Sequence, residues 1–120
     1  MAVGRGFPRS ARLLKRADFL AVMRSGDSSH DSYFTVFGVS GSRAKGRLGI
    51  TVSRRAASKA VHRNRLKRCV RESFRHHRNA LRGIDVVVIA RPAAARAEVR
   101  RLTEALRAHW KKILDSCGYC

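Results

Sequence analysis

Apolar residues alternate with other residues along two stretches of the chain, 33–39 and 47–53. Successive side chains of a strand point to opposite faces of its sheet, so this spacing predicts two β-strands. The first strand is apolar on both faces, with Tyr33, Thr35, Phe37 and Val39 on one and Phe34 and Val36 on the other. The second strand is expected to point inward with Leu48, Ile50 and Val52. The Gly and Ser residues of the segment between them, 40–46, predict a hairpin connection.

A third strand is predicted at residues 85–90, where Asp85 is followed by an unbroken apolar run, VVVIA. Such a run is typical of a strand that is covered on both faces. Residues 59–82 before it repeat apolar positions every three or four residues, which predicts a helix that Gly83 stops. The order strand, helix, strand indicates a crossover unit.

Two other segments also have helical spacing. Residues 7–24 predict a short helix, with Pro8 and Ser10 as entry signals. Its apolar side carries Leu14, Phe19, Val22 and Met23. Residues 94–114 predict an amphipathic closing helix whose repeated positions are Val99, Leu102, Leu106, Trp110 and Ile113. Residues 25–32, SGDSSHDS, are rich in turn formers and predict a loop.

These elements predict an α+β fold, a two-layer α/β sandwich in which helices pack on a sheet. A chain of 120 residues is long enough for one modest core, so we expect a single domain over 1–120. We expect about six residues at each end to be flexible. Hydrophobic residues make up 44% of the chain, which is ordinary for a globular protein.

The charge is not ordinary, because the formal net charge is +19. Residues 54–82 carry eleven of the 27 Lys and Arg and a single acid, Glu72. At about 100° per residue, one arc of the predicted helix holds Asn64, Lys67, Arg68, Arg71, Arg75 and Arg78. The opposite side holds Leu66, Cys69, Val70, Phe74 and Leu81. We therefore expect the apolar side to enter the core while the cations face a polyanion, with nucleic acid the first candidate.

Other features narrow the class of protein. No apolar run approaches the roughly 18 to 20 residues of a spanning helix, and no apolar region resembles a secretion signal, so we expect a cytoplasmic protein. Three cysteines, Cys69, Cys117 and Cys120, are too few and odd in number for a disulfide framework. Cys117 and Cys120 with His109 offer three donors, whereas a structural zinc site needs four, so a mobile thiol tail is the favoured interpretation.

The string Arg63-Asn64-Arg65-Leu66-Lys67-Arg68, continued by Arg71-Glu72 and Phe74-Arg75, resembles the RNR signature of the bacterial ribonuclease P protein component. The resemblance extends to the strand and basic turn at 47–55, to the strand at 85–90 with Arg91, and to Phe7-Pro8 and Asp18-Phe19. It covers most of residues 7–114 and agrees with the length and charge of the chain.

This resemblance implies a protein subunit of ribonuclease P, an endonuclease of tRNA processing that removes the 5′ leader of precursor tRNA. The implied partners are the catalytic RNA subunit and precursor tRNA, with no membrane and no obligate protein partner. The RNA would hold the catalytic groups and most of the Mg²⁺, so no catalytic or metal-binding residue is expected in this chain. The implied topology is αβββαβα, with about four strands and a left-handed crossover, as in ribosomal-protein-type RNA-binding domains.

The resemblance also implies two surfaces. The first, here called the RNA-subunit surface, consists of Arg54, Arg55, Arg63, Asn64, Arg65, Lys67, Arg68 and Arg71. Its arginines present planar forks that suit phosphate oxygens. The second, the leader surface, consists of Phe19, Met23, Phe34 and Phe37 between the first helix and the sheet. Aromatic faces stack on bases without strict sequence choice. Strand parity sends Phe34 and Phe37 to opposite faces, so at least one of them is expected in the core.

Four alternatives remain open on the residues alone. The basic helix could present a solvated face, although such faces usually mix acids with bases. A structural RNA-binding protein, such as a ribosomal component, would share the same features. A protein nuclease could use His62, His76 or His77, but Glu72 is the only carboxylate near them in sequence and two-metal sites need several. A membrane-surface protein ranks last, because the core needs the apolar side of the helix.

Overall fold

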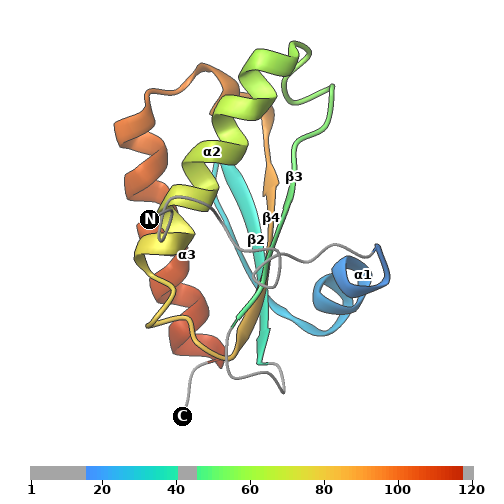
Figure 1. Ribbon diagram of the computed structural model, residues 1–120, viewed down its shortest axis with the longest axis vertical. Helices are drawn as coiled ribbons and strands as arrows, with labels where there is room; N and C mark the ends of the chain where they lie inside the picture. Colours follow the sequence, from blue (N-terminus) through green and yellow to red (C-terminus); the bar gives the residue numbers. More distant parts are fainter. Residues whose placement is uncertain (1–15, 41–45, 118–120) are drawn as a thin grey trace, which may run out of the picture.

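The computed structural model describes residues 16–40 and 46–117. Along the chain, the elements are α1 (Arg16–Ser25), β1 (Asp27–His30), β2 (Phe34–Ser40), β3 (Leu48–Thr51), α2 (Ala60–His76), β4 (Ile84–Ala90), the 3₁₀ helix η2 (Pro92–Arg96) and α3 (Val99–Cys117) (Figure 1). Apart from η2, this is the predicted order αβββαβα. The α+β class is confirmed, with a mixed sheet of four strands. No helix in these two ranges is long and apolar enough to cross a membrane.

The sheet has the strand order β1-β2-β4-β3. β4 pairs antiparallel with β2 over seven residues, from Phe34 opposite Ala90 to Ser40 opposite Ile84, and parallel with β3. Its central position explains the unbroken apolar run of its sequence, because helices cover both faces there. The hairpin expected between the two alternating strands is wrong, since β4 lies between β2 and β3.

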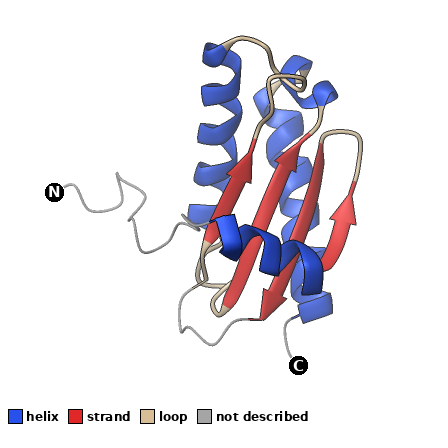
Figure 2. Ribbon diagram, turned by 90° about the vertical axis from the view of Figure 1, so that its right-hand side faces the viewer, coloured by secondary structure: helices blue, strands red, loops and turns tan. Residues whose placement is uncertain are grey.

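The crossover from β3 through α2 to β4 is left-handed. In Figure 2, which looks onto the sheet from the α1 side, β3 and β4 point upward, β4 lies to the right of β3, and α2 lies behind the sheet. A right-handed crossover, the usual case, would place β4 on the other side of β3. The handedness implied by the family resemblance is therefore confirmed.

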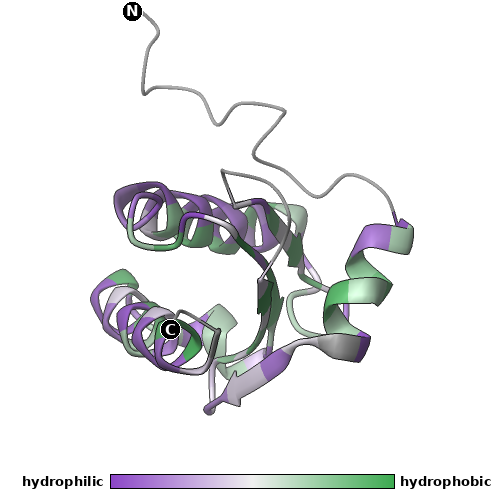
Figure 3. Cartoon of the chain, turned by 90° about the horizontal axis from the view of Figure 1, so that it is seen from below, coloured by the Kyte–Doolittle hydropathy of each residue, from purple (hydrophilic) through white to green (hydrophobic). Residues whose placement is uncertain are grey.

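The helices divide the apolar residues into two cores. α2 and α3 cover one face of the sheet and α1 covers the other, as the end-on view shows (Figure 3). The larger core, beneath α2 and α3, includes Phe34, Leu66, Phe74, Leu106 and Trp110. The smaller core, beneath α1, has Val22 and Val87 fully buried, with Phe19, Phe37, Val39 and Ile89 partly buried around them. Both faces of β2 are apolar because each one faces a core.

Residues 25–32 are not the loop that their composition suggests. Asp27–His30 form β1, an edge strand in register with β2 from Asp27 opposite Gly38 to His30 opposite Thr35. Of its four side chains only that of Ser29 is buried, so the strand has no apolar pattern to reveal it. Backbone pairing with β2 decides its structure and overrides the weak strand propensity of Asp and Ser.

The other helices differ from expectation at their ends. α2 stops at His76 rather than near residue 82, and Gly83, at φ 81°, turns the chain into β4 instead of ending the helix. The closing helix begins only at Val99, after η2, because Pro92 opens a separate 3₁₀ turn. Val99 is 50% exposed and does not belong to the core, whereas Leu102, Leu106, Trp110 and Ile113 are buried as expected.

Some predictions concern residues outside the described ranges. Pro8, Ser10, Leu14 and Cys120 lie there, as do the segment 41–45 and, of the ends that were expected to be flexible, residues 1–6 and 118–120. Residues 115–117 belong to α3.

Candidate nucleic-acid interface

The chain enters α2 through a tight turn that begins at Ser53. The backbone N–H groups of Ala56 and Ala57 donate to the Ser53 carbonyl at 3.1 and 3.0 Å, and the N–H of Ala56 also donates to Ser53 Oγ at 3.1 Å. Both alanines are buried, which fixes the turn to the larger core. Arg54 and Arg55 lie between these anchors and are exposed. A fixed backbone thus presents two cations to solvent just before the helix.

The apolar side of α2 is in the core, as the sequence predicts. Of the five residues expected there, Leu66, Cys69, Val70 and Phe74 are buried on α2. Leu81 is buried too, but it follows the end of the helix at His76. Phe74 meets the ring of Trp110 on α3 edge to face, with ring centroids 5.9 Å apart. The indole Nε1 of Trp110 donates to Ser73 Oγ at 2.8 Å. These contacts fasten α2 to α3 and fix which way its other side points.

That other side of α2 is cationic and reaches solvent. Asn64 and Arg68 are exposed, while Lys67 and Arg71 are partly exposed. The first turn of α2 has no acidic residue, and Lys59 caps it without a side-chain hydrogen bond. A helix N-terminus carries partial positive charge from its unpaired N–H groups, so it adds to the attraction that these cations exert on an anion.

Two arginines of the RNA-subunit surface also hold the fold together. Arg63 Nη1 donates to the carbonyls of Ala57 at 3.0 Å and Ser58 at 2.8 Å, which ties the helix back to the preceding turn. Arg65 Nη2 donates to the carbonyl of Ala97 at 2.9 Å, in the segment before α3. A guanidinium has five N–H donors, so these bonds orient each group and leave donors for phosphate oxygens.

The predicted RNA-subunit surface is thus brought together on one continuous stretch, the turn after Ser53 and the N-terminal part of α2. Helical spacing predicted the outward direction of four of its members, Asn64, Lys67, Arg68 and Arg71, because they lie on one arc of the helix. The anchoring of Arg63 and Arg65 to backbone carbonyls could not be foreseen, since it depends on how the turn and η2 pack beside α2.

On the opposite face of the sheet, three of the four predicted leader residues lie at or near the smaller core. Phe19 on α1 and Phe37 on β2 are partly buried in it, and Met23 is 36% exposed on α1. Leu20, which the sequence did not single out, is also exposed there. The ring of Phe19 lies directly on Gly49, where an added Cβ would approach its Cζ to 2.7 Å. Apolar side chains therefore remain accessible on the α1 side.

Phe34 is not part of this face, and its assignment to the leader surface is corrected. Its side chain is fully buried in the larger core, beneath α2 and α3, where its ring meets that of His109 edge to face at 6.5 Å between centroids. The cause is strand parity, because Phe34 and Phe37 are three residues apart on β2 and point to opposite faces.

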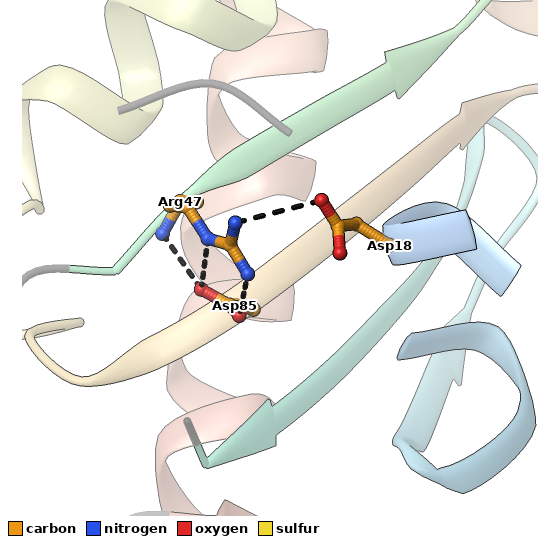
Figure 4. A network of polar contacts seen from close by, with 3 residues as sticks. All are labelled: Asp18, Arg47 and Asp85. Atoms are coloured by element: carbon orange, nitrogen blue, oxygen red, sulfur yellow. Dashed lines mark hydrogen bonds and ion pairs between the residues drawn. The ribbon is translucent and has the colours of Figure 1, made fainter. Parts of the chain in front are cut away.

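Arg47 joins α1 to the sheet in a network that the sequence did not reveal (Figure 4). Its Nη2 lies 2.9 Å from Asp85 Oδ2, and its Nε and backbone N–H both donate to Asp85 Oδ1, at 3.3 and 3.1 Å. Its Nη1 lies 3.6 Å from Asp18 Oδ2 on α1. The hydrogen bond with Asp85 raises the pKa of Arg47, so the guanidinium stays charged. One side chain thus holds the first turn of α1 against the starts of β3 and β4.

A second buried network surrounds His109 on α3, a residue that the sequence suggested only as a possible metal ligand. His109 Nδ1 and Ser29 Oγ share a hydrogen bond of 2.8 Å, and Nε2 lies 3.0 Å from Asp31 Oδ2. Burial lowers the pKa of His109, although Asp31 partly opposes the shift. For Asp31, burial raises the pKa, but the N–H groups of Phe34 and Tyr33 and the nearby His109 outweigh it and the net shift is downward. This network ties α3 to β1.

The two histidines at the C-terminal end of α2 each contact a residue of the same helix. His76 Nε2 lies 3.4 Å from Glu72 Oε1, which Arg75 also contacts, and His77 Nδ1 lies 2.9 Å from the Ser73 carbonyl oxygen. In residues 16–40 and 46–117, no three His, Cys, Asp or Glu residues are grouped so that they could hold a metal ion.

The chain is similar to known proteins both in sequence and in fold. The sequence is similar to the ribonuclease P protein components of Thioalkalivibrio sulfidiphilus, at 38% identity over 98% of both chains, and of Methylococcus capsulatus, at 44% identity over 96% of this chain and 90% of the other. Among solved structures, it is similar to the ribonuclease P protein of Staphylococcus aureus, with a TM-score of 0.79, 32% identity and coverage of 84% and 93% of the two chains.

The ribonuclease P protein of Thermotoga maritima superimposes with a TM-score of 0.76 at 37% identity, over 85% of this chain and 96% of that one. The family model for ribonuclease P matches residues 7–114, which include α2 and its cationic side. The chain therefore belongs to the ribonuclease P protein family and is a protein subunit of that endoribonuclease.

Proposed function

We propose that this chain binds the catalytic RNA of ribonuclease P through the RNA-subunit surface on α2. The observation that carries the proposal is the division of α2 into two sides. Its apolar side is buried against the sheet and α3, while its other side holds cations that the fold keeps at the surface. A rigid row of cations neutralises RNA phosphates without first having to become ordered.

We further propose that the 5′ leader of precursor tRNA crosses the α1 side, over Phe19, Met23 and Phe37. Partly exposed apolar and aromatic groups contact unpaired bases of any identity, which suits a subunit that meets many leaders. The leader and the RNA subunit would then occupy opposite faces of the sheet. In this proposal the cleavage takes place in the cytoplasm, where the precursor tRNA is made.

Catalysis is assigned to the RNA subunit, which would hold the Mg²⁺ that activates water. The carboxylates near the two surfaces of this chain do not fit a Mg²⁺ site, because each already faces cations or backbone donors. Asp18 and Asp85 flank Arg47, Glu72 contacts Arg75, and Asp31 accepts from backbone N–H groups. The contribution of the protein is to neutralise phosphates and to position the substrate.

Reconstitution tests this function. The purified chain, mixed with a bacterial-type catalytic RNA, should speed cleavage of precursor tRNA at physiological Mg²⁺ well above the rate of either component alone. Arg68→Ala should weaken RNA binding and reduce the salt dependence by roughly one unit of slope for each phosphate that is no longer neutralised. Arg107→Ala, an exposed arginine on α3 outside the RNA-subunit surface, is the matched control. Equal rates with and without the protein would end the proposal.

A further inference from the structure

A groove of about 480 Å³ lies between α2 and the first half of α3. Its floor contains Cys69 and Ser73, both buried, and Val99 and Thr103 form the α3 wall. The hydrogen bond from Trp110 Nε1 on α3 to Ser73 Oγ, one of the floor residues, fastens the two helices beside the groove. Its volume is within the range of roughly 300–1,000 Å³ that is usual for small-ligand sites.

Charged side chains of α2 line the groove, and the two arginines lie at a different end from the acid. Arg65 and Arg68 stand at one end, and Glu72 and His76 stand toward the other. Both arginines belong to the RNA-subunit surface, so an RNA strand that follows this surface reaches the mouth of the groove. The bond from Arg65 to the Ala97 carbonyl fixes one of these cations beside the mouth before any ligand arrives.

The floor is suited to an apolar group. Burial raises the pKa of the Cys69 thiol, which therefore stays uncharged. Ser73 Oγ is already bonded to Trp110, and Thr103 Oγ1 donates to the Val99 carbonyl at 2.9 Å, so neither hydroxyl needs a partner from a ligand. Val99 leaves half of its surface exposed at the mouth, so a ligand that enters the groove would cover apolar surface there.

From these features we infer that the groove receives the base of one unpaired nucleotide of the RNA subunit, with the phosphate of that nucleotide on Arg65 and Arg68. The inference rests on the proposed function and adds a site for a single splayed base to it. Charge sets the direction of entry. Arg65 and Arg68 attract the phosphate to their end of the groove. At the other end, Glu72 Oε1 already contacts Arg75 and His76, and the second oxygen of the carboxylate can accept a hydrogen bond from the amino edge of a base.

Filling the groove tests the inference. Thr103→Phe places a ring where the base would lie, and Val99→Phe fills the mouth from a half-exposed position with little strain on the fold. Ala108→Phe is the matched control, because it adds the same ring at an exposed position of α3 outside the groove. Circular dichroism establishes that each variant is folded, and if Thr103→Phe is not, Val99→Phe decides the test.

Affinity for the RNA subunit is measured by filter binding at several salt concentrations, with a chemical footprint at nucleotide resolution. We expect the two filling variants to bind about tenfold more weakly. Their salt dependence should be unchanged, because the arginines still neutralise the same phosphates, and protection should disappear at one unpaired nucleotide. The control should bind like the unmodified chain.

Several outcomes would overturn the inference. Wild-type affinity and an unchanged footprint in both filling variants would show that no base enters the groove. If Ala108→Phe weakened RNA binding as much as the filling variants do, the added ring would be acting outside the groove. If the filling variants changed the oligomeric state of the RNA-free protein, the groove would be a contact between copies of the chain. A chain that fails to bind the RNA even without substitution contradicts the proposed function itself, which separates the two failures.

Discussion

The two faces of the sheet are held by different means. Beneath α2 and α3 lies a continuous core closed by large side chains such as Trp110, Phe34 and Phe74. Beneath α1, within the described part of the chain, the buried apolar cluster consists of Val22 and Val87, and the helix is fastened instead by Arg47 and by the contact of Phe19 with Gly49. The first face maintains the fold and orients the cations of α2. The second leaves apolar groups accessible to a ligand and needs a polar network to keep α1 in place.

The largest contrast between the faces is expected for their aromatic residues. Phe74→Ala should lower the free energy of unfolding by about 3–5 kcal/mol, because it empties the space beside Trp110 and leaves a cavity. Phe19→Ala, from a partly buried ring, should cost clearly less stability but reduce leader binding. Urea unfolding measures the first effect and leader affinity the second. Equal losses of stability in the two variants would remove the distinction between the cores.

The polar network is tested by Arg47→Met, which keeps the length of the side chain but leaves Asp85 buried without its cation. Since these two side chains are only 17% and 10% exposed, we expect a loss of about 3 kcal/mol in the free energy of unfolding. Asp18→Asn removes only the contact between Arg47 and Asp18, and it should lower the free energy of unfolding by less than about 1 kcal/mol.

Leader affinity separates the two roles of Arg47. If the ion pair between Arg47 and Asp18 positions α1, Asp18→Asn should weaken leader binding, while the affinity for the RNA subunit stays unchanged. A variant that binds the leader normally would limit Arg47 to stabilising the starts of β3 and β4.

Gly49→Ala tests the close packing of α1. The added Cβ would meet Phe19 at 2.7 Å, so the ring and α1 must move outward, at a cost of about 1–3 kcal/mol. Leader binding should also weaken, because Phe19 and α1 are displaced. The double variant with Phe19→Leu, which shortens the opposing side chain, should recover part of the lost stability in thermal unfolding. No recovery would mean that the strain lies elsewhere than between these two residues.

The smallest effect concerns pH and belongs to the α3 face. The pKa of His109 is lower in the folded chain than the ordinary value of 6.5, so the unfolded chain binds more protons at slightly acidic pH. Stability should therefore be complete above about pH 6.5 and fall as the pH drops toward the folded pKa. The charged and titratable groups that act on His109 are Asp31, Lys112 and His30. The pKa of Asp31 is also lowered, but from 3.8, so its contribution is lost only in stronger acid.

The measurement is the urea midpoint between pH 8 and pH 5, with His109→Gln as the comparison. The variant should be less stable at every pH but should change less over this range. Parallel curves for the two proteins would assign the acid sensitivity to other groups.

Sequence alone predicted the parts of the fold that depend on local periodicity. The alternation of β2, the apolar run of β4 and the two sides of α2 follow from spacing, and all were confirmed. β1 was missed because its stability comes from pairing with β2 and not from its own side chains. The end of α2 was misplaced because the apolar rhythm continues to Leu81, whereas the helix stops at His76.

The cationic side of α2 was predicted from helical spacing, but the residues of the RNA-subunit surface could be assigned to RNA only through the family resemblance. The Arg47 network was missed because its partners are far away in the chain. One signal could have found it, since Arg47 directly precedes β3 and Asp85 stands at the start of β4. A parallel pairing of these strands, with Leu48 opposite Val86, places Arg47 beside Asp85.

The lengths of the strands bear on how the protein behaves before it meets RNA. The inner strands β2 and β4 have seven residues each, whereas the strands at the two edges, β1 and β3, have four. A short edge offers few unpaired backbone groups to a neighbouring chain, and β1 adds charged and polar side chains along its length. With a net charge of +19 repelling each copy from the next, the sheet is a poor template for aggregation. The same charge that draws the chain to RNA thus helps to keep its copies apart at high concentration.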